Sequence, residues 1–586
     1  MVDTGRTLFW RRTAAGIAGA IFILAAIFTS EFDLTRAYAV AAQPATQQNS
    51  PTSKSRKTPK KAHIKPKPPK PVPLDELPPV PIEVADSGQN PLENFFQGLA
   101  KLEPAQPVTP EAALGSQSPS PVTPPAANSE TPGQAQTATG AQAPPTSPTQ
   151  AETTPSEPAK SEPAPSGVVH IIHFGDSHVA SDYWAGVLRE KLQARFGDAG
   201  PGFVLPGRPW PTIRYVEARS LDGQGWRTDG LKYTERDGVV GLGGMSLESY
   251  REVSPASASA SFTQFQVFAA TAPGATCLHV QVDDADLPDL SSQVEHVVTA
   301  PAAPAPDDRV PEPSPKSLGG GAADPPSPLA PIAPVKKSRK RRKSKPPVPQ
   351  GPPFTPWPAG QPLDLVELSN SNPVPVGAHN LSIRSSCGPQ ARVLGVELYN
   401  GSKGVVYDTD GVNGARLEDL EKPLPALRAA LLKDSQPSLI IVSYGTNDIG
   451  MRGFSPSEYE EQVFQILTRL KQDAGDASIL VTGPTDRGSP RKRTRTMLQA
   501  GQEALQPAVR KAALRAGCAY WDQQAAMGGP GSMARWVRAG LGQFDYVHFT
   551  GAGYQKLANM LYDQLMVEYE KSGGKSTPQA PAPVNP

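Results

Sequence analysis

The segment VVHIIHFGDSHVASDYW, residues 168–184, decides the fold expected for this chain. A short apolar run, Val168 to Phe174, passes directly into a Gly-Asp-Ser turn, and a helix is expected from about Ser181. Short and continuously apolar runs are typical of parallel strands buried on both faces. Ligands of such α/β folds collect at the carboxyl ends of the strands, which is where Ser177 is predicted to lie.

Further runs of the same kind follow later in the chain. PSLIIVSYG (437–445), ASILVTGP (477–484) and CAYWD (518–522) are short and apolar, and helical patterns at 455–473 and 494–517 separate them. This alternation predicts a doubly wound parallel sheet with helices on its faces.

The region between the first strand and these later runs has a different pattern. Residues 256–271, 277–284 and 379–400 alternate apolar and polar residues, as half-exposed antiparallel strands do. We therefore expect a β-sandwich, 251–400, inserted between the first part of the α/β domain (167–250) and its second part (401–572).

Much of the remaining chain has the composition of a linker. The 586 residues include 68 Pro and 52 Gly, too much Pro for one continuous packed body. Residues 40–166 are expected to be a disordered Pro-rich linker, 299–360 a disordered loop inside the sandwich, and 573–586 a disordered tail. An apolar stripe near 92–102 predicts one short helix, which would dock either onto the folded domain or onto a partner.

The N-terminus predicts export. Arg6, Arg11 and Arg12 precede the apolar stretch 13–30, which is close to the minimum length for spanning a bilayer. Residues 1–39 are therefore expected to be a signal-anchor or a signal peptide, with everything after them outside the cytoplasm. A small-x-small sequence at 37–39 lies far beyond the apolar run, so we favour an uncleaved anchor in the inner membrane.

The formal net charge is +1, which gives no global basic field for nucleic acid, and no nucleic-acid partner is expected. Basic residues cluster in segments 54–70 and 336–345, which would be either solvated loops or contacts to an anionic envelope polymer. Cys277, Cys387 and Cys518 form no CxxC pair. A bridge between Cys277 and Cys387 stays open if the chain is exported, although buried free thiols are favoured. No metal-ligand spacing and no cofactor motif is evident.

A serine nucleophile needs a base to take its proton. His548 lies just before a C-terminal helical pattern, and Asp545 precedes it by three residues, so one turn can present both groups. Gly414 and Asn447 each lie where a strand is expected to end, and their amides are candidate oxyanion donors. The glycines of 241–244 are a rival to Gly414.

The blocks GDSH, GVNGA, GTND and DYVH, in this order, resemble the four blocks of the SGNH (GDSL-like) hydrolase family. The resemblance implies a flavodoxin-like α/β fold with Ser177 as nucleophile, His548 as base and Asp545 as the acid that orients it. It also implies an oxyanion hole formed by the amides of Ser177 and Gly414 and by the Asn447 side chain.

The sequence around the first block resembles the envelope branch that contains peptidoglycan O-acetylesterases. This implies an enzyme of the cell envelope, on the periplasmic side, that removes acyl groups from a polysaccharide. His178 would either line the substrate pocket or pack beside the nucleophile, and Trp184 would either stack on a sugar ring or, as the default, pack in the core. Two alternatives stay open, a glycan O-acyltransferase that uses the same serine and a glycan-binding module without activity.

Overall fold

The computed structural model describes residues 72–85, 90–103, 167–207, 213–221, 223–231, 237–251, 254–297, 356–358, 360–449 and 455–574. All of them belong to one compact unit, Pro71–Pro586. The expected anchor 1–39, the basic segments 54–70 and 336–345 and the tail beyond residue 574 lie outside the described residues. None of the described helices is both long enough and apolar enough to cross a membrane.

A five-stranded parallel sheet forms the centre of the α/β part, as the apolar runs predict. Its strand order is β14 (Gly404–Gly411), β1 (Val168–Gly175), β15 (Leu439–Ser443), β16 (Ser478–Thr482) and β17 (Ala519–Trp521). The first of these strands, β14, had not been assigned to this sheet from the sequence. Because β14 and β15 flank β1 on either side, the loops that follow them flank the Ser177 turn.

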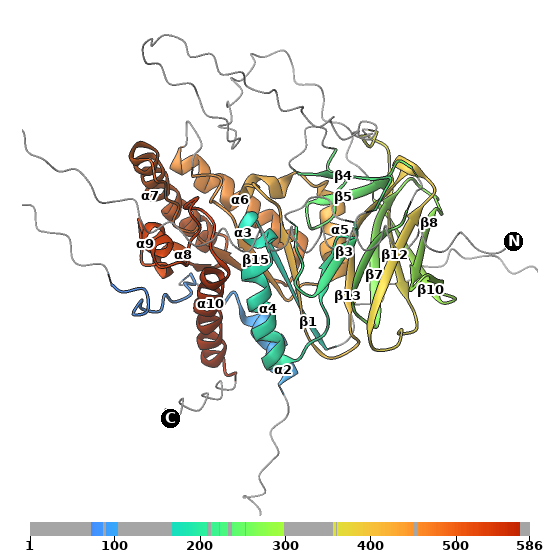
Figure 1. The fold of residues 1–586 in the computed structure, drawn as a ribbon, viewed down its shortest axis with the longest axis horizontal. Coiled ribbons are helices and arrows are strands. Elements are labelled where there is room, and N and C mark those ends of the chain that lie inside the picture. Colours follow the sequence, from blue (N-terminus) through green and yellow to red (C-terminus); the bar gives the residue numbers. More distant parts are fainter. Residues whose placement is uncertain are drawn as a thin grey trace, which may run out of the picture. The chain divides into compact units, whose positions relative to one another are not determined.

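Helices cover both faces of this sheet, which explains why its three later strands, β15 to β17, are mainly apolar. The helices α2 (Glu93–Leu102), α4 (Tyr183–Phe196) and α10 (Gly551–Lys571) share one core with the inward residues of one face. The helices α5 (Pro425–Ser435), α6 (Pro456–Ala474) and α7 (Lys492–Arg515) build the core on the other face. Figure 1 shows α4 and α10 side by side in front of the sheet.

Two antiparallel sheets form the expected sandwich, and one apolar core joins them. The first sheet has the order β10 (Leu290–Val297), β11 (Leu363–Asn370), β7 (Gln264–Thr271), β13 (Ala391–Tyr399), β5 (Met245–Ser249) and β4 (Trp226–Gly230), with β2 (Gly202–Val204) also paired to β13. The second has the order β3 (Ala218–Leu221), β6 (Ala256–Ser261), β12 (Ala378–Ser385), β8 (Leu278–Val282) and β9 (Ala285–Asp286).

This topology corrects the expected boundary at residue 251. The four strands β2 to β5 precede that residue, yet they belong to the sandwich, which therefore begins near Gly202. Strands β2 and β5 pair with β13, which is distant in sequence, so no local pattern could assign them to this sheet. Strand β10 ends at Val297, which pairs with Leu363 at the start of β11. The segment 299–360, which was expected to be a loop, therefore connects two paired strand ends of the sandwich.

The favoured reading of Cys277 and Cys387 as free thiols is wrong. The two form a disulfide with a Cα–Cα distance of 5.7 Å. Strands β8 and β12 pair so that Leu278 lies opposite Ser385. Cys277 directly precedes β8 and Cys387 follows β12 by two residues, so this pairing brings the two cysteines within bridging distance. Cys518 is a buried free thiol.

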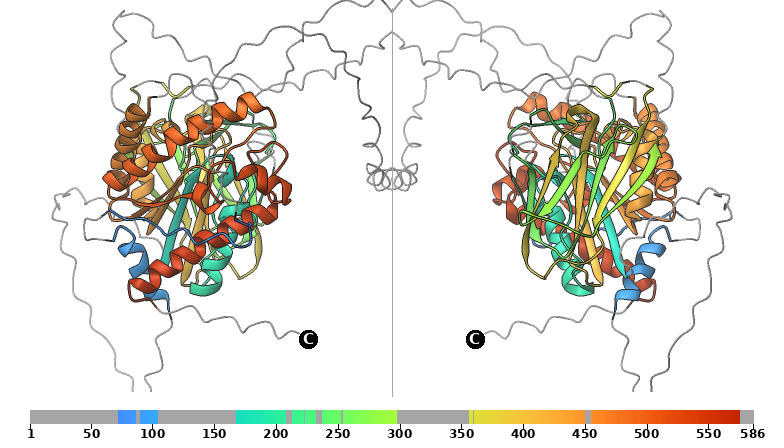
Figure 2. Two further views of the ribbon diagram at one scale, coloured as in Figure 1. Left: turned by 90° about the vertical axis from the view of Figure 1, so that its left-hand side faces the viewer. Right: turned by 90° about the vertical axis from the view of Figure 1, so that its right-hand side faces the viewer.

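The linker 40–166 is not unstructured throughout. Helix α2 docks onto the folded domain, as one of the two alternatives proposed, and buries Phe95, Phe96 and Leu99. Figure 2 shows it as the blue helix at the margin of the α/β part. Upstream of it, Glu83 forms an antiparallel bridge with Tyr520 through both backbone hydrogen bonds, which covers part of the edge strand β17.

Candidate active site

The turn after β1 is tight, and two glycines make it so. A Cβ on Gly175 would lie 2.2 Å from Val179 Cγ2, and one on Gly411, at the end of β14, would lie 2.1 Å from the Ala180 nitrogen. The buried Asp176 then accepts a 2.9 Å hydrogen bond from the His178 amide. Ser177 is thereby fixed, partly exposed, at the carboxyl end of β1.

The three residues expected to act as nucleophile, base and orienting acid are joined by hydrogen bonds. Ser177 Oγ lies 2.8 Å from His548 Nε2, and His548 Nδ1 lies 2.7 Å from Asp545 Oδ2. The other carboxylate oxygen of Asp545 accepts from the amides of Val547 and His548 at 2.9 and 3.0 Å. These two amide bonds fix the carboxylate in the turn that precedes α10.

The charge state of Asp545 suits the support of an imidazolium. Partial burial raises the pKa of this carboxyl, but the hydrogen bonds from the His548 ring and from the two amides outweigh that effect and lower it. Asp545 is therefore ionised at neutral pH, and it accepts the Nδ1–H of His548 while Nε2 faces the serine hydroxyl.

Gly414 and Asn447 lie on the two loops that flank this turn. Gly414 is exposed and has φ +73°, a conformation that favours glycine. Asn447 Nδ2 donates to the Ala415 carbonyl at 2.9 Å and lies 3.5 Å from Asp176 Oδ2. The rival Gly241 instead packs against the sandwich, since its Cβ would lie 2.2 Å from the Leu394 carbonyl.

Of the alternatives open for Trp184 and His178, those in which the two side chains contact the substrate are wrong, and those in which they pack inside the domain hold. Trp184 is only 1% exposed and belongs to the core between α4 and the parallel sheet. His178 is 4% exposed; its ring lies 5.3 Å from that of His548, and its Nδ1 lies 3.0 Å from the Tyr554 hydroxyl. Burial lowers the pKa of His178 to about 3, so a neutral ring packs beside the neighbouring imidazole.

One group of possible metal ligands lies outside this site among the described residues, formed by the buried His170, Glu397 and Asp408. His170 Nδ1 lies 2.7 Å from the Ser435 carbonyl, and Nε2 lies 2.6 Å from Asp408 Oδ2. Burial lowers the pKa of His170, but the charges of Asp408 and Glu397 raise it to about 10. Both ring nitrogens of His170 thus face oxygen atoms, and the cluster forms a buried ion pair in this structure.

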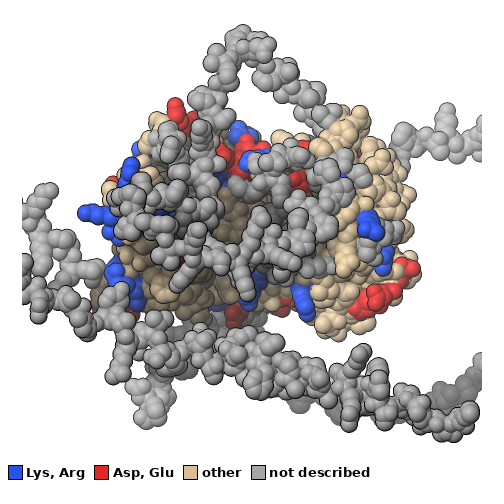
Figure 3. Space-filling model, turned by 45° about the horizontal axis from the view of Figure 1, so that its top comes forward, with Lys and Arg blue, Asp and Glu red and all other residues tan. Residues whose placement is uncertain are grey.

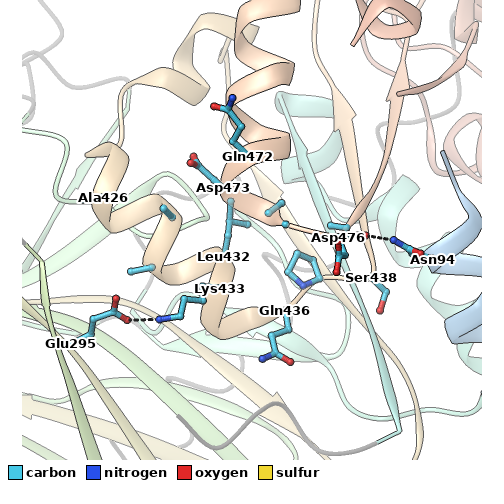
Figure 4. A pocket seen from close by; sticks show the side chains of 16 residues that line it. Asn94, Glu295, Ala426, Leu432, Lys433, Gln436, Ser438, Gln472, Asp473 and Asp476 are labelled. Atoms are coloured by element: carbon cyan, nitrogen blue, oxygen red, sulfur yellow. Dashed lines mark hydrogen bonds and ion pairs between the residues drawn. The ribbon is translucent and has the colours of Figure 1, made fainter. Parts of the chain in front are cut away.

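A hollow of about 680 Å³ lies at the opposite edge of the parallel sheet (Figure 4). It adjoins Ser438 and Ala477, at the amino ends of β15 and β16, and its rim carries an ion pair between Lys433 and Glu295. The residues lining it include no histidine that could activate Ser438. It is therefore remote from the chemistry at the carboxyl edge.

On the face in Figure 3, the described Lys and Arg side chains lie scattered among Asp and Glu and form no continuous basic patch. Sequence reasoning also missed Arg487, which follows β16 at the same edge as Ser177. Its position after a parallel strand was the signal that could have identified it.

Comparison with protein families identifies the second half of the α/β part. Residues 384–556 match the GDSL-like Lipase/Acylhydrolase family, a range that contains Gly414, Asn447, Asp545 and His548 but begins after Ser177. A search of curated proteins finds no match.

Solved structures with similar folds include three esterases. A peptidoglycan O-acetylesterase is 20% identical, with a TM-score of 0.47, over 70% of this chain and 93% of that one. A lipase/acylhydrolase from Enterococcus faecalis is 20% identical, with a TM-score of 0.22, over 30% and 80% of the two chains. A carbohydrate acetylesterase from Sinorhizobium meliloti is 14% identical, with a TM-score of 0.21, over 28% and 79%.

Proposed function

Because the chain carries a GDSL-like lipase/acylhydrolase domain and is a carboxylic ester hydrolase of the SGNH type, we propose that it removes O-acetyl groups from an envelope glycan, peptidoglycan, with Ser177 as the nucleophile. The observation that carries this proposal is the hydrogen-bonded series Ser177, His548, Asp545 at the carboxyl edge of the parallel sheet. A hydroxyl becomes a useful nucleophile when a neighbouring base accepts its proton, and His548 Nε2 is in reach.

The proposed reaction has two steps. Ser177 Oγ attacks the ester carbonyl while its proton passes to His548 Nε2, and the imidazolium then protonates the departing glycan oxygen. Asp545 stabilises the imidazolium through the Nδ1–H hydrogen bond. In the second step His548 takes a proton from water, which attacks the acyl carbon. The bond from this carbon to Ser177 Oγ then breaks, Oγ takes the proton back from His548, and the free acid leaves.

We assign the oxyanion hole to the amides of Ser177 and Gly414 and to Asn447 Nδ2. One Nδ2–H of Asn447 is engaged by the Ala415 carbonyl at 2.9 Å. The contact of Nδ2 with Asp176 is long at 3.5 Å and hence weak. The second hydrogen is therefore available to a developing negative charge, where each preorganised donor contributes about 3 kcal/mol.

The proposed place of action is the cell envelope, outside the cytoplasm. The predicted export segment supports this location, and the Cys277–Cys387 disulfide supports it independently, because such bridges form and persist in oxidising compartments. Contacts of the predicted N-terminal anchor with the inner membrane, and of the basic segments with anionic polymer, belong to the same proposal.

The test is acetate release from O-acetylated peptidoglycan by the unit Pro71–Pro586. We expect Ser177→Ala and His548→Ala each to lower kcat/KM by a factor of about 10³ or more. His279→Ala, which removes an exposed histidine of β8, is the matched control and retains activity. Cleavage of a small activated ester without acetate release from peptidoglycan would refute the proposed glycan. Equal activity of wild type and Ser177→Ala would refute the mechanism.

A further inference from the structure

Arg487 lies on the loop that follows β16, between the loop that carries Asn447 and the turn that carries Asp545 and His548. Its Nη1 donates to the Thr446 carbonyl at 2.7 Å, one residue before Asn447. The next residue, Gly488, donates its amide to the Tyr546 carbonyl at 2.9 Å, inside the turn that carries Asp545 and His548. The loop that carries Arg487 is thus hydrogen-bonded to the loop that carries Asn447 and to the turn that carries Asp545 and His548.

The loop that carries Arg487 is held rigidly. The side chain of Asp486, only 1% exposed, accepts hydrogen bonds from the amides of Gly531 and Met533 at 3.1 and 2.8 Å. Behind it, Gln502 of α7 donates to the Thr485 carbonyl at 3.0 Å. A guanidinium on such a support loses little further freedom when it binds a ligand.

The charge of Arg487 is not neutralised by an ion pair. The buried arginines Arg189, Arg392 and Arg428 each have a carboxylate partner, whereas no described carboxylate lies within ion-pair distance of Arg487. Its buried Nε also has no hydrogen-bond partner among the described residues. Burial lowers the pKa of Arg487, although the more distant Asp176 and Asp545 oppose this; an arginine nevertheless stays charged in proteins.

We infer that Arg487 is a specificity-determining residue that binds a carboxylate of the substrate next to the scissile ester, so that the enzyme selects acylated glycans that carry negative charge. This inference rests on the proposed esterase function and names the substrate class of the same site. A planar guanidinium matches a carboxylate through two parallel hydrogen bonds. A neutral substituent at this position would leave the cation without a counter-charge.

A pair of substrates that differ only in charge tests this inference. O-acetylated peptidoglycan fragments with free carboxylates are compared with the same fragments after their carboxylates are converted to carboxamides. For the full-length chain, we expect kcat/KM for acetate release to be about tenfold to a hundredfold higher on the acidic fragments, since hydrogen bonds to charged groups are the strong ones. This preference should decline as salt is raised.

Substitution of the arginine should remove the preference. In Arg487→Gln the ratio of kcat/KM between the two substrates should fall close to one, chiefly through KM on the acidic fragments. Arg487→Lys keeps the positive charge but lacks the planar guanidinium, and it should retain part of the preference for the acidic fragments. Arg493→Gln removes one exposed positive charge from the start of α7 and should leave the ratio as in wild type.

The outcomes separate the two proposals. Acetate release by wild type without a charge preference, or an equal loss on both substrates in Arg487→Gln, would overturn the inference and leave the esterase intact. If wild type releases no acetate from either fragment, the proposed glycan is wrong. The ratio of kcat/KM is then measured on two activated acetate esters, one with a carboxylate and one with a carboxamide on the alcohol part, and loss of selectivity in Arg487→Gln would still support the role of Arg487.

Discussion

Trp184 is a core residue, which was the default of the two roles that its aromatic ring left open. Aromatic residues near a glycan-processing serine can stack on sugar rings. The Trp184 indole instead packs between α4 and the sheet, where its ring centroid lies 4.9 Å from that of His173. The location of its Cα, seven residues after Ser177, contains no information on which way the side chain points. Helix α4 buries it because the side of the helix that carries Trp184 and Leu188 faces the sheet.

We predict that Trp184→Ala lowers the free energy of unfolding by about 3–5 kcal/mol, as large-to-small changes in a core do. Denaturant unfolding measures this effect. The exposed Tyr183 next to it is 40% exposed, so Tyr183→Ala serves as the comparison and should cost less. A Trp184→Ala protein of normal stability with a raised KM would contradict the assignment to the core.

Helix α2 shows what an isolated apolar stripe can do in a Pro-rich segment. Its ten residues are too few for a stable helix in water, so its stability must come from packing. Phe96 contacts the ring of Tyr569 of α10 at 5.8 Å, and Asn94 donates to the Asp476 carbonyl at 2.6 Å. The segment is therefore part of the folded domain, although more than 60 residues separate it from β1.

We predict that Phe95→Ala, at a fully buried position of α2, destabilises the folded domain by about 3–5 kcal/mol. Lys101→Ala, at an exposed position of the same helix, should stay within about 0.5 kcal/mol of wild type. Thermal unfolding of both variants is the measurement, and equal stabilities would show that α2 contributes no packing energy.

At the scale of the whole molecule, one buried ion cluster joins the parallel sheet to the sandwich. His170 lies on β1, Asp408 on β14 and Glu397 on the sandwich strand β13. Tyr399 of the same sandwich strand donates its hydroxyl to Glu397. Because the partners come from both parts, the charge state of the cluster affects how firmly the two parts are held together.

This cluster predicts a pH dependence of stability. The pKa of His170 is raised from 6.5 to about 10 in the folded protein. Its contribution to the free energy of unfolding is therefore complete below pH 6.5 and is lost as the pH rises towards 10. The pKa of Glu397 is raised by burial from 4.5 to about 7, so the stability that its protonated form contributes is lost between pH 4.5 and 7. Above pH 7 we expect a decline of up to about 1.4 kcal/mol per pH unit from His170.

Denaturant unfolding between pH 7 and 10 measures this decline. His170→Gln, which retains hydrogen-bonding groups but does not titrate, should give a flatter profile than wild type. The exposed His279 is the matched position, and His279→Gln should follow the wild-type slope. The same slope in His170→Gln as in wild type would show that another group governs the alkaline loss.

The sequence by itself determined the features that depend on local pattern. Four of the five parallel strands followed from short apolar runs. Ser177 and Asn447 followed from their positions after such runs, and Gly414 from its position where a further strand was expected to end. Asp545 and His548 followed from their spacing just before a helical pattern. Parallel strands bring their carboxyl ends to a common edge whatever the order of the strands. Such a conclusion needs no knowledge of distant contacts.

Only the tertiary structure decided which distant segments meet. The Cys277–Cys387 bridge spans 110 residues, strands β2 and β5 pair with β13, far along the chain, and Arg487 lies between two loops that come from other parts of the sequence. Each of these depends on packing between segments whose local sequences are compatible with several partners. Hydrophobic period and turn chemistry specify the elements, while the complementarity of their surfaces specifies the neighbours.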